Sequence, residues 1–294
     1  MKTTSSQTAK IVVLLAILSG DHRAVGAADM WQFVLDWGIS GSVEDIAVDP
    51  DGLVYVLDKS NGRIQVFTPD GQFLREKTGF VEPTGIAVDA KGVIYLQLRC
   101  RVARYTPEFQ LLDNWDSCNG MGDLQENLSI DVADSVVWVG SVADVLKFTP
   151  EGTFLGRFMA NMTFTGVDAR SDGSIWVSIE YGSSGLVRHY ASDGQLLGEW
   201  SPRLPGEQVS TPFDIDSDST GNVYVSDGQI KMFTSDGSVL EVLSPALGSF
   251  VDVELDGDDT LYAGKALPSQ VVRFHRAPMA VERMNWGEIK WRYR

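Results

Sequence analysis

Carboxylate side chains recur at two positions of a pattern that repeats along this 294-residue chain. The first position lies just before the residue that anchors the first expected strand of each repeat unit, and the second lies two residues further on. The acids are Asp45, Asp214 and Asp252 at the first position, and Asp131, Asp168, Asp216 and Glu254 at the second. Carboxylates crowded against a wall of low dielectric constant repel one another, so they take up protons, pair with bases or bind a cation.

The acids at the first position predict a cation site. Asp45, Asp214 and Asp252 belong to units 1, 5 and 6, which become neighbours only if the repeat closes into a ring. No unit has a basic residue at this position, and oxygen-rich sets suit Ca²⁺ or Mg²⁺. We therefore expect a divalent-metal site at these three residues, with Asp216 and Glu254 in the same binding site. The alternative is structural, with the acids capping strand ends, accepting hydrogen bonds from backbone N–H groups or facing channel water.

The sequence lacks the residues for other kinds of catalysis. It has no Gly-rich phosphate loop and no nucleophile elbow. After residue 27 it has two histidines, His189 and His275, and both are expected on third strands, away from the axis. We assign no catalytic residue from the sequence.

Two series of aromatic residues reveal an internal repeat. An apolar–aromatic–apolar triplet occurs six times, with its aromatic residues 38–48 positions apart. A second aromatic residue follows each triplet, and this series has spacings of 38–43. The two series are Tyr55, Tyr95, Trp138, Trp176, Tyr224 and Tyr262, and Phe67, Tyr105, Phe148, Tyr190, Phe233 and Phe274. One shared period near 40 residues identifies six repeat units.

Each unit contains four short strand patterns separated by turns. In unit 1 these are Asp45–Val48, Leu53–Leu57, Arg63–Thr68 and Gln72–Arg75. β-Branched and aromatic residues fill the strands, whereas Gly, Asp, Asn and Pro fill the turns. Four strands in each of six units predict an all-β fold, a six-bladed β-propeller with four-stranded antiparallel blades and the aromatic residues between blades.

The two ends of the repeat region complement each other. The last unit has no good fourth strand after Phe274, while Trp31–Trp37 resembles a fourth strand and precedes unit 1. We expect this N-terminal strand to pair beside Val271–Phe274, which would close the ring and remove an exposed sheet edge.

Two segments carry a family resemblance. Pro83–Asp89 and Asp58–Phe67 resemble the NHL repeat, and the likeness extends over Trp31–Phe274, weakening after the first two units. The resemblance implies a six-bladed propeller. It does not imply one function, because this fold has many.

The first 27 residues resemble a signal peptide. Lys2 and Lys10 precede the apolar run Ile11–Leu18, and the small residues Val25–Ala27 precede a cleavage site. We expect a signal peptide at 1–27, a propeller at 28–276 and an aromatic, basic tail at 277–294. The mature protein would be secreted or periplasmic, with no transmembrane segment.

The mature chain is strongly acidic. Removal of residues 1–27 takes away three of the 24 basic residues and one of the 40 acidic ones, so 21 and 39 remain and the formal charge is −18. Nucleic acid and anionic membranes would be repelled, so we expect neither as a partner.

Variable loops and both cysteines map to one face of the expected propeller. The loops 115–126, 180–185 and 201–210 are longer than their counterparts, and Cys100 and Cys118 lie on the same face. In an exported chain we expect a disulfide between these cysteines; the alternative is two free thiols in a reducing compartment.

Two functions fit these patterns. The first is a non-enzymatic binding or interaction scaffold that takes a protein, peptide or glycan ligand on the loop face. The second is a divalent-metal-dependent hydrolase or lyase, lactonase-like, with its site at the acidic channel mouth. The two differ in whether the acids converge on a shared cation.

Overall fold

The computed structural model describes residues 30–277, apart from 119–126, 134, 143, 160–161, 183–184, 208–210 and 244–248. The expected signal peptide lies outside the described residues, as does the expected tail except for Ala277. The propeller unit spans Trp31–Arg276. Within the described part of the chain, no helix is long and apolar enough to cross a membrane.

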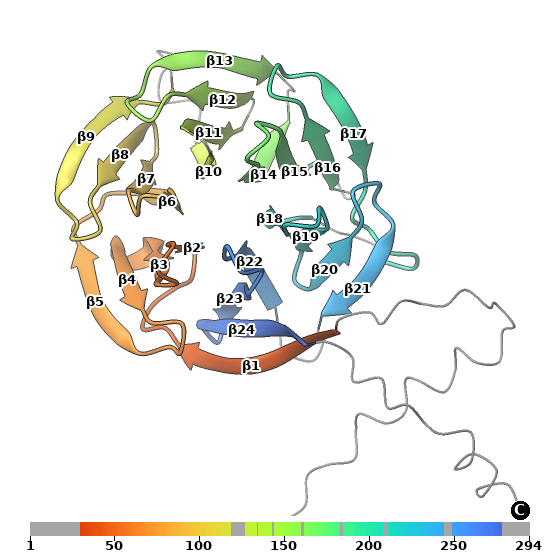
Figure 1. The fold of residues 1–294 in the computed structure, drawn as a ribbon, viewed down its shortest axis with the longest axis horizontal. Helices are drawn as coiled ribbons and strands as arrows, with labels where there is room; N and C mark the ends of the chain where they lie inside the picture. Colours follow the sequence, from red (N-terminus) through yellow and green to blue (C-terminus); the bar gives the residue numbers. More distant parts are fainter. Residues whose placement is uncertain are drawn as a thin grey trace, which may run out of the picture. The chain divides into compact units, whose positions relative to one another are not determined.

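Six four-stranded antiparallel sheets surround a central axis, each with its first strand innermost (Figure 1). Blade 1 consists of β2 (Asp45–Val48), β3 (Val54–Asp58), β4 (Arg63–Phe67) and β5 (Phe73–Thr78). Blade 2 consists of β6 (Pro83–Val88), β7 (Ile94–Leu98), β8 (Arg101–Tyr105) and β9 (Leu111–Asp116). Blade 3 consists of β10 (Asn127–Ala133), β11 (Val136–Ser141), β12 (Asp144–Phe148) and β13 (Phe154–Met159). Blade 4 consists of β14 (Thr163–Ala169), β15 (Ile175–Glu180), β16 (Leu186–Tyr190) and β17 (Leu196–Trp200). Blade 5 consists of β18 (Asp214–Ser217), β19 (Val223–Ser226), β20 (Ile230–Phe233) and β21 (Val239–Leu243). Blade 6 consists of β22 (Ser249–Leu255), β23 (Leu261–Leu267), β24 (Gln270–Ala277) and β1 (Met30–Gly38). A short 3₁₀ helix, η3 (Lys59–Asn61), joins β3 to β4. The predicted six-bladed propeller is confirmed.

The N-terminal strand closes the ring, as predicted. β1 pairs with β24 and forms the outer edge of blade 6 (Figure 1). Its Trp31 packs edge-on against Tyr224 of blade 5, with ring centroids 5.7 Å apart. Arg276, at the other end of the propeller, donates to Tyr224 Oη at 3.0 Å and to Asp218 Oδ2 at 3.1 Å. Both ends of the propeller are therefore held against the same part of blade 5.

Aspartates shape the turns between first and second strands. Asp49 Oδ1 accepts from the backbone N–H groups of Asp51 (3.0 Å) and Leu53 (2.8 Å), and Oδ2 accepts from Tyr55 Oη at 3.0 Å. Asp218 repeats this arrangement in blade 5. The Asp-Gly turns of the sequence thus fix the register of the hairpins and also hold the buried tyrosine of the second strand.

The triplet aromatic residues pack between blades. Tyr55 of blade 1 is fully buried and belongs to a cluster with Ile86 and Leu96 of blade 2. Tyr262 of blade 6 packs in the same way against Ile46 of blade 1. A four-stranded sheet cannot bury both faces alone, so each blade uses its neighbour as its hydrophobic core.

Basic side chains add polar contacts between blades. Lys147 lies 4.8 Å above the Trp138 ring and donates to the carbonyl of Ser192 in blade 4 at 3.0 Å. In blade 4, the residue that pairs with the aromatic Trp176 on the adjacent strand is His189. The two rings stack with their centroids 4.1 Å apart. Burial lowers the pKa of His189, so this histidine is a neutral packing residue outside the channel.

The predicted disulfide is present. Cys100 and Cys118 form a disulfide with a Cα–Cα distance of 4.9 Å. It joins the turn between β7 and β8 to the segment that follows β9, and Cys118 is buried. The described end of this segment is thereby fixed to blade 2.

Glycines in three turns allow tryptophans of the preceding blade to pack closely. Trp37, Trp115 and Trp200 lie against the turns between third and fourth strands of the next blade. At Gly237 (φ 82°) a Cβ would lie 2.5 Å from Trp200 Cγ. Glycine is needed there both for its backbone angle and for this contact.

Gly237→Ala is expected to destabilise the protein more than Gly221→Ala in the same blade. Both glycines have positive φ, 82° and 86°, but a Cβ at position 221 has nothing within 4 Å. Each substitution carries a backbone cost of about 1–2 kcal/mol, and the clash with Trp200 should add about 1–3 kcal/mol. Urea unfolding of the two variants measures this difference, and equal losses of stability would contradict the proposed contact between blades.

Candidate functional site

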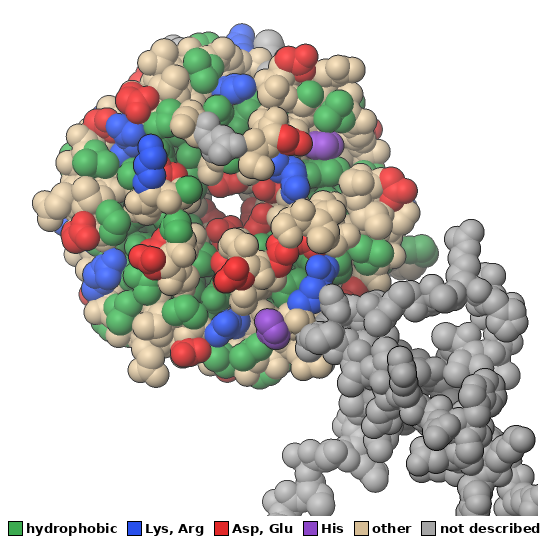
Figure 2. Space-filling view, in the orientation of Figure 1, with side chains coloured by type: hydrophobic (Ala, Val, Ile, Leu, Met, Phe, Trp, Pro, Cys, Tyr) green, Lys and Arg blue, Asp and Glu red, His purple; other side chains and the backbone are tan. Residues whose placement is uncertain are grey.

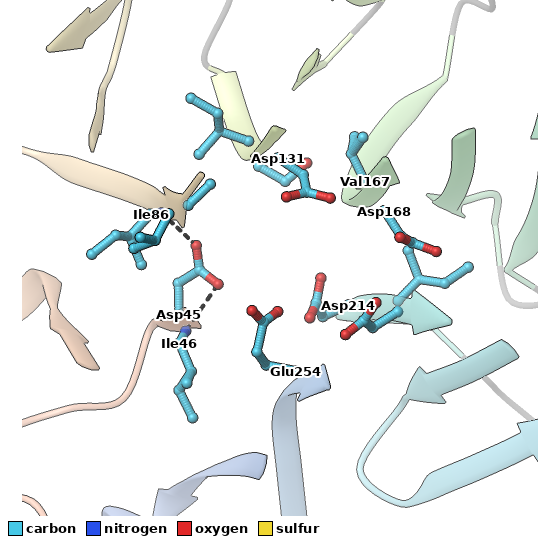
Figure 3. Close-up of a pocket in the computed structure, with 14 residues that line it drawn as sticks. Asp45, Ile46, Ile86, Asp131, Val167, Asp168, Asp214 and Glu254 are labelled. Carbon is cyan, nitrogen blue, oxygen red and sulfur yellow. Dashed lines mark hydrogen bonds between the residues drawn. The ribbon is translucent and has the colours of Figure 1, made fainter. Parts of the chain in front are cut away.

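Acidic side chains line the centre of the ring. Figure 2 shows them around the central opening, and Figure 3 shows that Asp45, Asp131, Asp168, Asp214 and Glu254 project from different innermost strands toward the axis. These residues and Asp216 line a narrow cavity of about 40 Å³, room for about three water molecules. The structure therefore brings the acids of both repeat positions to one channel.

The channel carboxylates connect neighbouring blades. Asp45 Oδ1 accepts from its own strand at Ile46 N (3.0 Å), and Oδ2 accepts from Ile86 N in blade 2 (2.6 Å). The same bridge joins Asp131 to Val132 N and Ala169 N, each at 2.6 Å. The innermost strands have a free edge, and these carboxylates satisfy N–H groups along it.

The bridges continue on the far side of the ring. Asp216 Oδ2 accepts from Leu255 N in blade 6 at 2.5 Å, and Asp214 Oδ2 accepts from Val253 N at 3.2 Å. Glu254 Oε1 then accepts from Val48 N in blade 1 at 3.3 Å, across the closure of the ring. Hydrogen bonding to backbone N–H groups, the structural alternative considered from the sequence, is thus what the geometry shows for most of these oxygens.

Asp168 uses a hydroxyl group instead of a backbone N–H group. Ser217 Oγ of blade 5 donates to Asp168 Oδ2, and Arg170 Nη1 donates to the same Ser217 oxygen. The positive charge of Arg170 lies close to Asp168 and opposes the rise in the pKa of that carboxyl group.

Burial raises the pKa of these carboxyl groups. It raises the pKa to about 6 for Asp131 and Asp214 and to about 7 for Asp168, and neighbouring charges such as Asp131 beside Asp168 add to the rise. The pKa values of Asp45, Asp216, Asp252 and Glu254 are also raised well above their usual range, mainly by burial. At neutral pH the channel therefore holds protons as well as negative charge.

A larger cavity opens at the channel mouth. It has a volume of about 420 Å³ and is lined by all three acids of the first position, Asp45, Asp214 and Asp252, together with hydroxyl and apolar side chains. The side chain of Asp252 differs from the bridging acids because its buried Oδ2 accepts no hydrogen bond from a backbone N–H group of the described residues. Its carboxyl group instead shares hydrogen bonds with the carboxyl groups of Asp214 and Asp45. The gathering of these acids at one side of the mouth stays a prediction, because residues of all six blades line this cavity.

Two hydroxyl groups belong to residues that line the mouth cavity. Thr84 Oγ1 and Ser129 Oγ are buried without a hydrogen-bond partner among the described residues, and both residues line the cavity. Ser129 occupies the same repeat position as Asp45, so the repeat alignment could have identified it. Thr84 precedes that position by one residue and carries no comparable signal in the sequence.

The described residues do not form a ready-made metal site. Among them, no group of three or more His, Cys, Asp or Glu side chains is arranged to hold a metal ion. The bridging hydrogen bonds give a physical reason, since Asp45 directs both carboxylate oxygens to backbone N–H groups. The carboxyl group of Asp252 is likewise engaged, because it shares hydrogen bonds with those of Asp214 and Asp45.

Comparisons with known proteins agree with the fold. The NHL repeat profile matches residues 42–67, which cover β2 to β4 of blade 1. Similar solved structures include a gluconolactonase from Xanthomonas campestris, with 17% identity, a TM-score of 0.68, and coverage of 86% of this chain and 93% of that one. They also include a luciferin-regenerating enzyme, with 12% identity, a TM-score of 0.68, and coverage of 84% of this chain and 95% of that one. A streptogramin B lyase is also similar, with 13% identity, a TM-score of 0.61, and coverage of 84% of this chain and 98% of that one. A comparison with curated protein sequences gives no match.

At these identities, the structural likeness shows the fold alone. The fold defines a class, the six-bladed β-propellers. Within that class, the chain is a propeller that carries an NHL repeat.

The raised pKa values predict that the protein is more stable in mild acid than in mild base. A carboxyl group with a raised pKa in the folded state binds a proton that the unfolded chain has already released. Stability therefore falls as the pH rises through about 6 to 7, the values for Asp131, Asp214 and Asp168. We expect the Tm at pH 5.5 to exceed that at pH 8 by about 3 °C or more, since 1 kcal/mol corresponds to about 2–4 °C at this size.

The matched control is Asp168→Asn, which keeps an oxygen for the Ser217 hydroxyl and removes one titrating group. Its Tm should change less between pH 5.5 and pH 8 than that of the wild type. A wild-type Tm that stays constant or rises between pH 5.5 and pH 8 would show that ionisation of the channel acids does not lower the free energy of unfolding.

Proposed function

We propose that this protein is a non-enzymatic binding protein that takes a protein, peptide or glycan ligand on the face where the channel mouth opens. The mouth cavity is the observation that carries the proposal. Its lining combines carboxylates, hydroxyl groups and apolar side chains, which suit hydrogen bonding and packing, and the described lining residues include no imidazole, thiol or amine. Proteins that bind by such surfaces use preformed pockets with a few polar groups.

An ion pair ties Glu207 to blade 5. Lys231 is 1% exposed, and its ammonium group donates to Glu207 Oε2 at 2.7 Å and to Asp227 Oδ2 at 2.5 Å. Glu207 follows β17, whereas Lys231 is on β20. We expect this buried ion pair to order Glu207 and its described neighbours before a ligand arrives, which would lower the entropic cost of binding.

Secretion or export to the periplasm is part of this proposal. The apolar N-terminal segment supports it, and so does the Cys100–Cys118 disulfide, because disulfides persist in oxidising compartments. An acidic surface also favours ligands that are neutral or basic.

Peptide and glycan arrays test the binding face. Phe213 lines the mouth and is 44% exposed, and Leu197 on the outer strand β17 is 52% exposed and serves as the matched control. We expect Phe213→Ser to abolish array signals that Leu197→Ser retains. Signals lost equally in both variants, or in neither, would place the binding surface elsewhere.

A second candidate function is a divalent-metal-dependent hydrolase or lyase with Ca²⁺ or Mg²⁺ at Asp45, Asp214 and Asp252. All three aspartates line one cavity, which favours it, and the gluconolactonase and lyase among the similar structures are enzymes of these classes. A bound metal would be held by oxygen ligands and would polarise a carbonyl group.

Thermal unfolding with Ca²⁺ or Mg²⁺ decides whether this candidate stands. If the cation binds, the Tm should rise with its concentration by mass action, and replacement of the three aspartates with Asn should abolish the rise. The triple variant should also unfold at a slightly higher temperature without cation, because the like charges are gone. An unmoved wild-type Tm would remove the support for a metal-dependent enzyme.

A further inference from the structure

One tyrosine of the repeat lacks the hydrogen bond that its counterparts make. The hydroxyl groups of Tyr55, Tyr95 and Tyr224 each donate to the aspartate of the turn before their strand, at 3.0, 3.3 and 3.0 Å. Tyr262 occupies the same repeat position in blade 6 and is 1% exposed. Its hydroxyl group makes no hydrogen bond with the described residues. A buried polar group without a partner is rare in folded proteins.

The aspartate of the same turn also has an unpaired oxygen. Asp256 Oδ1 accepts from the backbone N–H groups of Asp258 at 3.0 Å and Thr260 at 2.8 Å, whereas Oδ2 accepts no hydrogen bond from the described residues. Burial raises the pKa of the Tyr262 hydroxyl to about 12, and the nearby charge of Asp256 adds to the rise. The tyrosine is therefore protonated at neutral pH. A donor and an acceptor thus lie near each other without a bond between them.

These groups line an open cavity between blades 6 and 1. It has a volume of about 450 Å³ and lies at the turns between first and second strands, at the strand ends opposite the channel mouth. The Tyr262 ring packs in the hydrophobic cluster between the two blades, so its hydroxyl end is the part that reaches the cavity. Arg273 pairs with Tyr262 across the strands, and its Cζ lies 5.9 Å from the ring centroid. Its Nε is buried without a partner among the described residues.

We propose that this cavity binds a neutral sugar, with one hydroxyl group between Tyr262 Oη and Asp256 Oδ2 and a neighbouring sugar oxygen at the Arg273 guanidinium group. A hydroxyl group both donates and accepts hydrogen bonds, so it can pair with the tyrosine and the carboxylate together. An adjacent hydroxyl or ring oxygen accepts from the arginine. The site lies at the other end of the strands from the mouth cavity and is separate from the function proposed above.

The charges of the lining favour a neutral ligand over an ion. One arginine faces four aspartates, Asp49, Asp51, Asp256 and Asp258. Phosphates and acidic sugars would therefore be repelled. An ammonium group could pair with a carboxylate, but it has no acceptor for the Tyr262 and Arg273 donors. Among the described residues, no group of acidic side chains is arranged to hold a metal ion.

A cavity at the equivalent place between blades 2 and 3 lacks these open groups. It has a volume of about 470 Å³ and is lined by Asp89, Tyr95 and Arg104. The Tyr95 hydroxyl donates to Asp89, and Arg104 donates to Asp113 through Nε at 2.8 Å and through Nη2. In the repeat alignment, Leu35 of β1 occupies the position of Asp113, so the arginine of blade 6 has no such carboxylate. The polar groups of the sugar site are therefore specific to blade 6 among these two cavities.

Saturation-transfer NMR with the full mature protein tests the proposal. The neutral probes are the methyl α-glycosides of glucose, galactose and mannose, and the acidic probe is methyl α-glucuronide. We expect saturable binding of at least one neutral probe and none of the glucuronide. Tighter binding of the linear trisaccharide of the same sugar would assign an oligosaccharide source, whereas equal or weaker binding would assign a free monosaccharide. Absence of binding by all neutral probes, or equal binding of the glucuronide, would overturn the proposal.

Two tyrosine variants locate the hydrogen bond. Tyr262→Phe should weaken sugar binding about tenfold because it removes one hydrogen bond to the ligand. Tyr95→Phe should leave binding unchanged, since that hydroxyl group is already paired within its own blade. Without sugar the order reverses: Tyr95→Phe loses its bond to Asp89 and should lower the Tm, whereas Tyr262→Phe should not. Equal effects of the two variants on sugar binding would contradict the assigned contact.

A filled cavity provides a second, independent test. Gly257 lines the cavity, and a Cβ there has nothing within 4 Å, so Gly257→Leu adds bulk without a clash. Ala90→Leu adds bulk at the equivalent turn of the cavity between blades 2 and 3 and is the matched control. We expect sugar binding to be lost in the first variant and kept in the second. Binding that survives Gly257→Leu, or that is lost in Phe213→Ser at the mouth, would place the sugar elsewhere and overturn the proposal.

Discussion

The ring depends on hydrogen bonds that carboxylates make to the free edges of the innermost strands. Adjacent blades are separate sheets, so their innermost strands share no backbone ladder. The N–H groups along these edges face a channel with room for about three water molecules. Asp45 connects blade 1 to Ile86 of blade 2, and Glu254 connects blade 6 to Val48 of blade 1. One side chain thus satisfies a backbone donor and also joins two sheets, in addition to the apolar packing between them.

This arrangement has an electrostatic cost. Several carboxylates close to one axis cannot all be ionised in a space of low dielectric constant, so burial and mutual repulsion raise their pKa values. The cost is offset by hydrogen bonds that would otherwise be missing and by the hydrophobic packing of residues such as Tyr55 and Tyr262 between blades. Closure by β1 adds Trp31 to the interface between blades 5 and 6.

The sequence predicted the fold well because its signals are local and repeated. The strand expected at Asp45–Val48 has those bounds in the structure, and the outer strand expected at Trp31–Trp37 lies within β1. The disulfide was also predictable, because both cysteines flank one blade. The hydrogen bonds of the acids were not predictable from the sequence. The repeat alignment shows which residues share a position but does not show where each carboxylate oxygen points.

The interruptions in the acid series have a physical explanation that only the structure supplies. At Gly166 a Cβ would lie 2.5 Å from Asp214 Oδ1, so a side chain in blade 4 would displace the carboxylate of blade 5. The glycine is therefore part of the acidic site although it carries no functional group.

The acids at the mouth of the channel make two kinds of hydrogen bond. Asp45 directs both oxygens to backbone N–H groups, so its replacement would disturb the ring. Asp252 lines the same cavity, and its carboxyl group shares hydrogen bonds with those of Asp214 and Asp45. A hydrogen bond between two carboxyl groups requires a proton, and burial together with these neighbours holds the pKa of Asp252 well above its usual range. A shared proton lets these acids line one cavity with less repulsion than three ionised carboxylates would have.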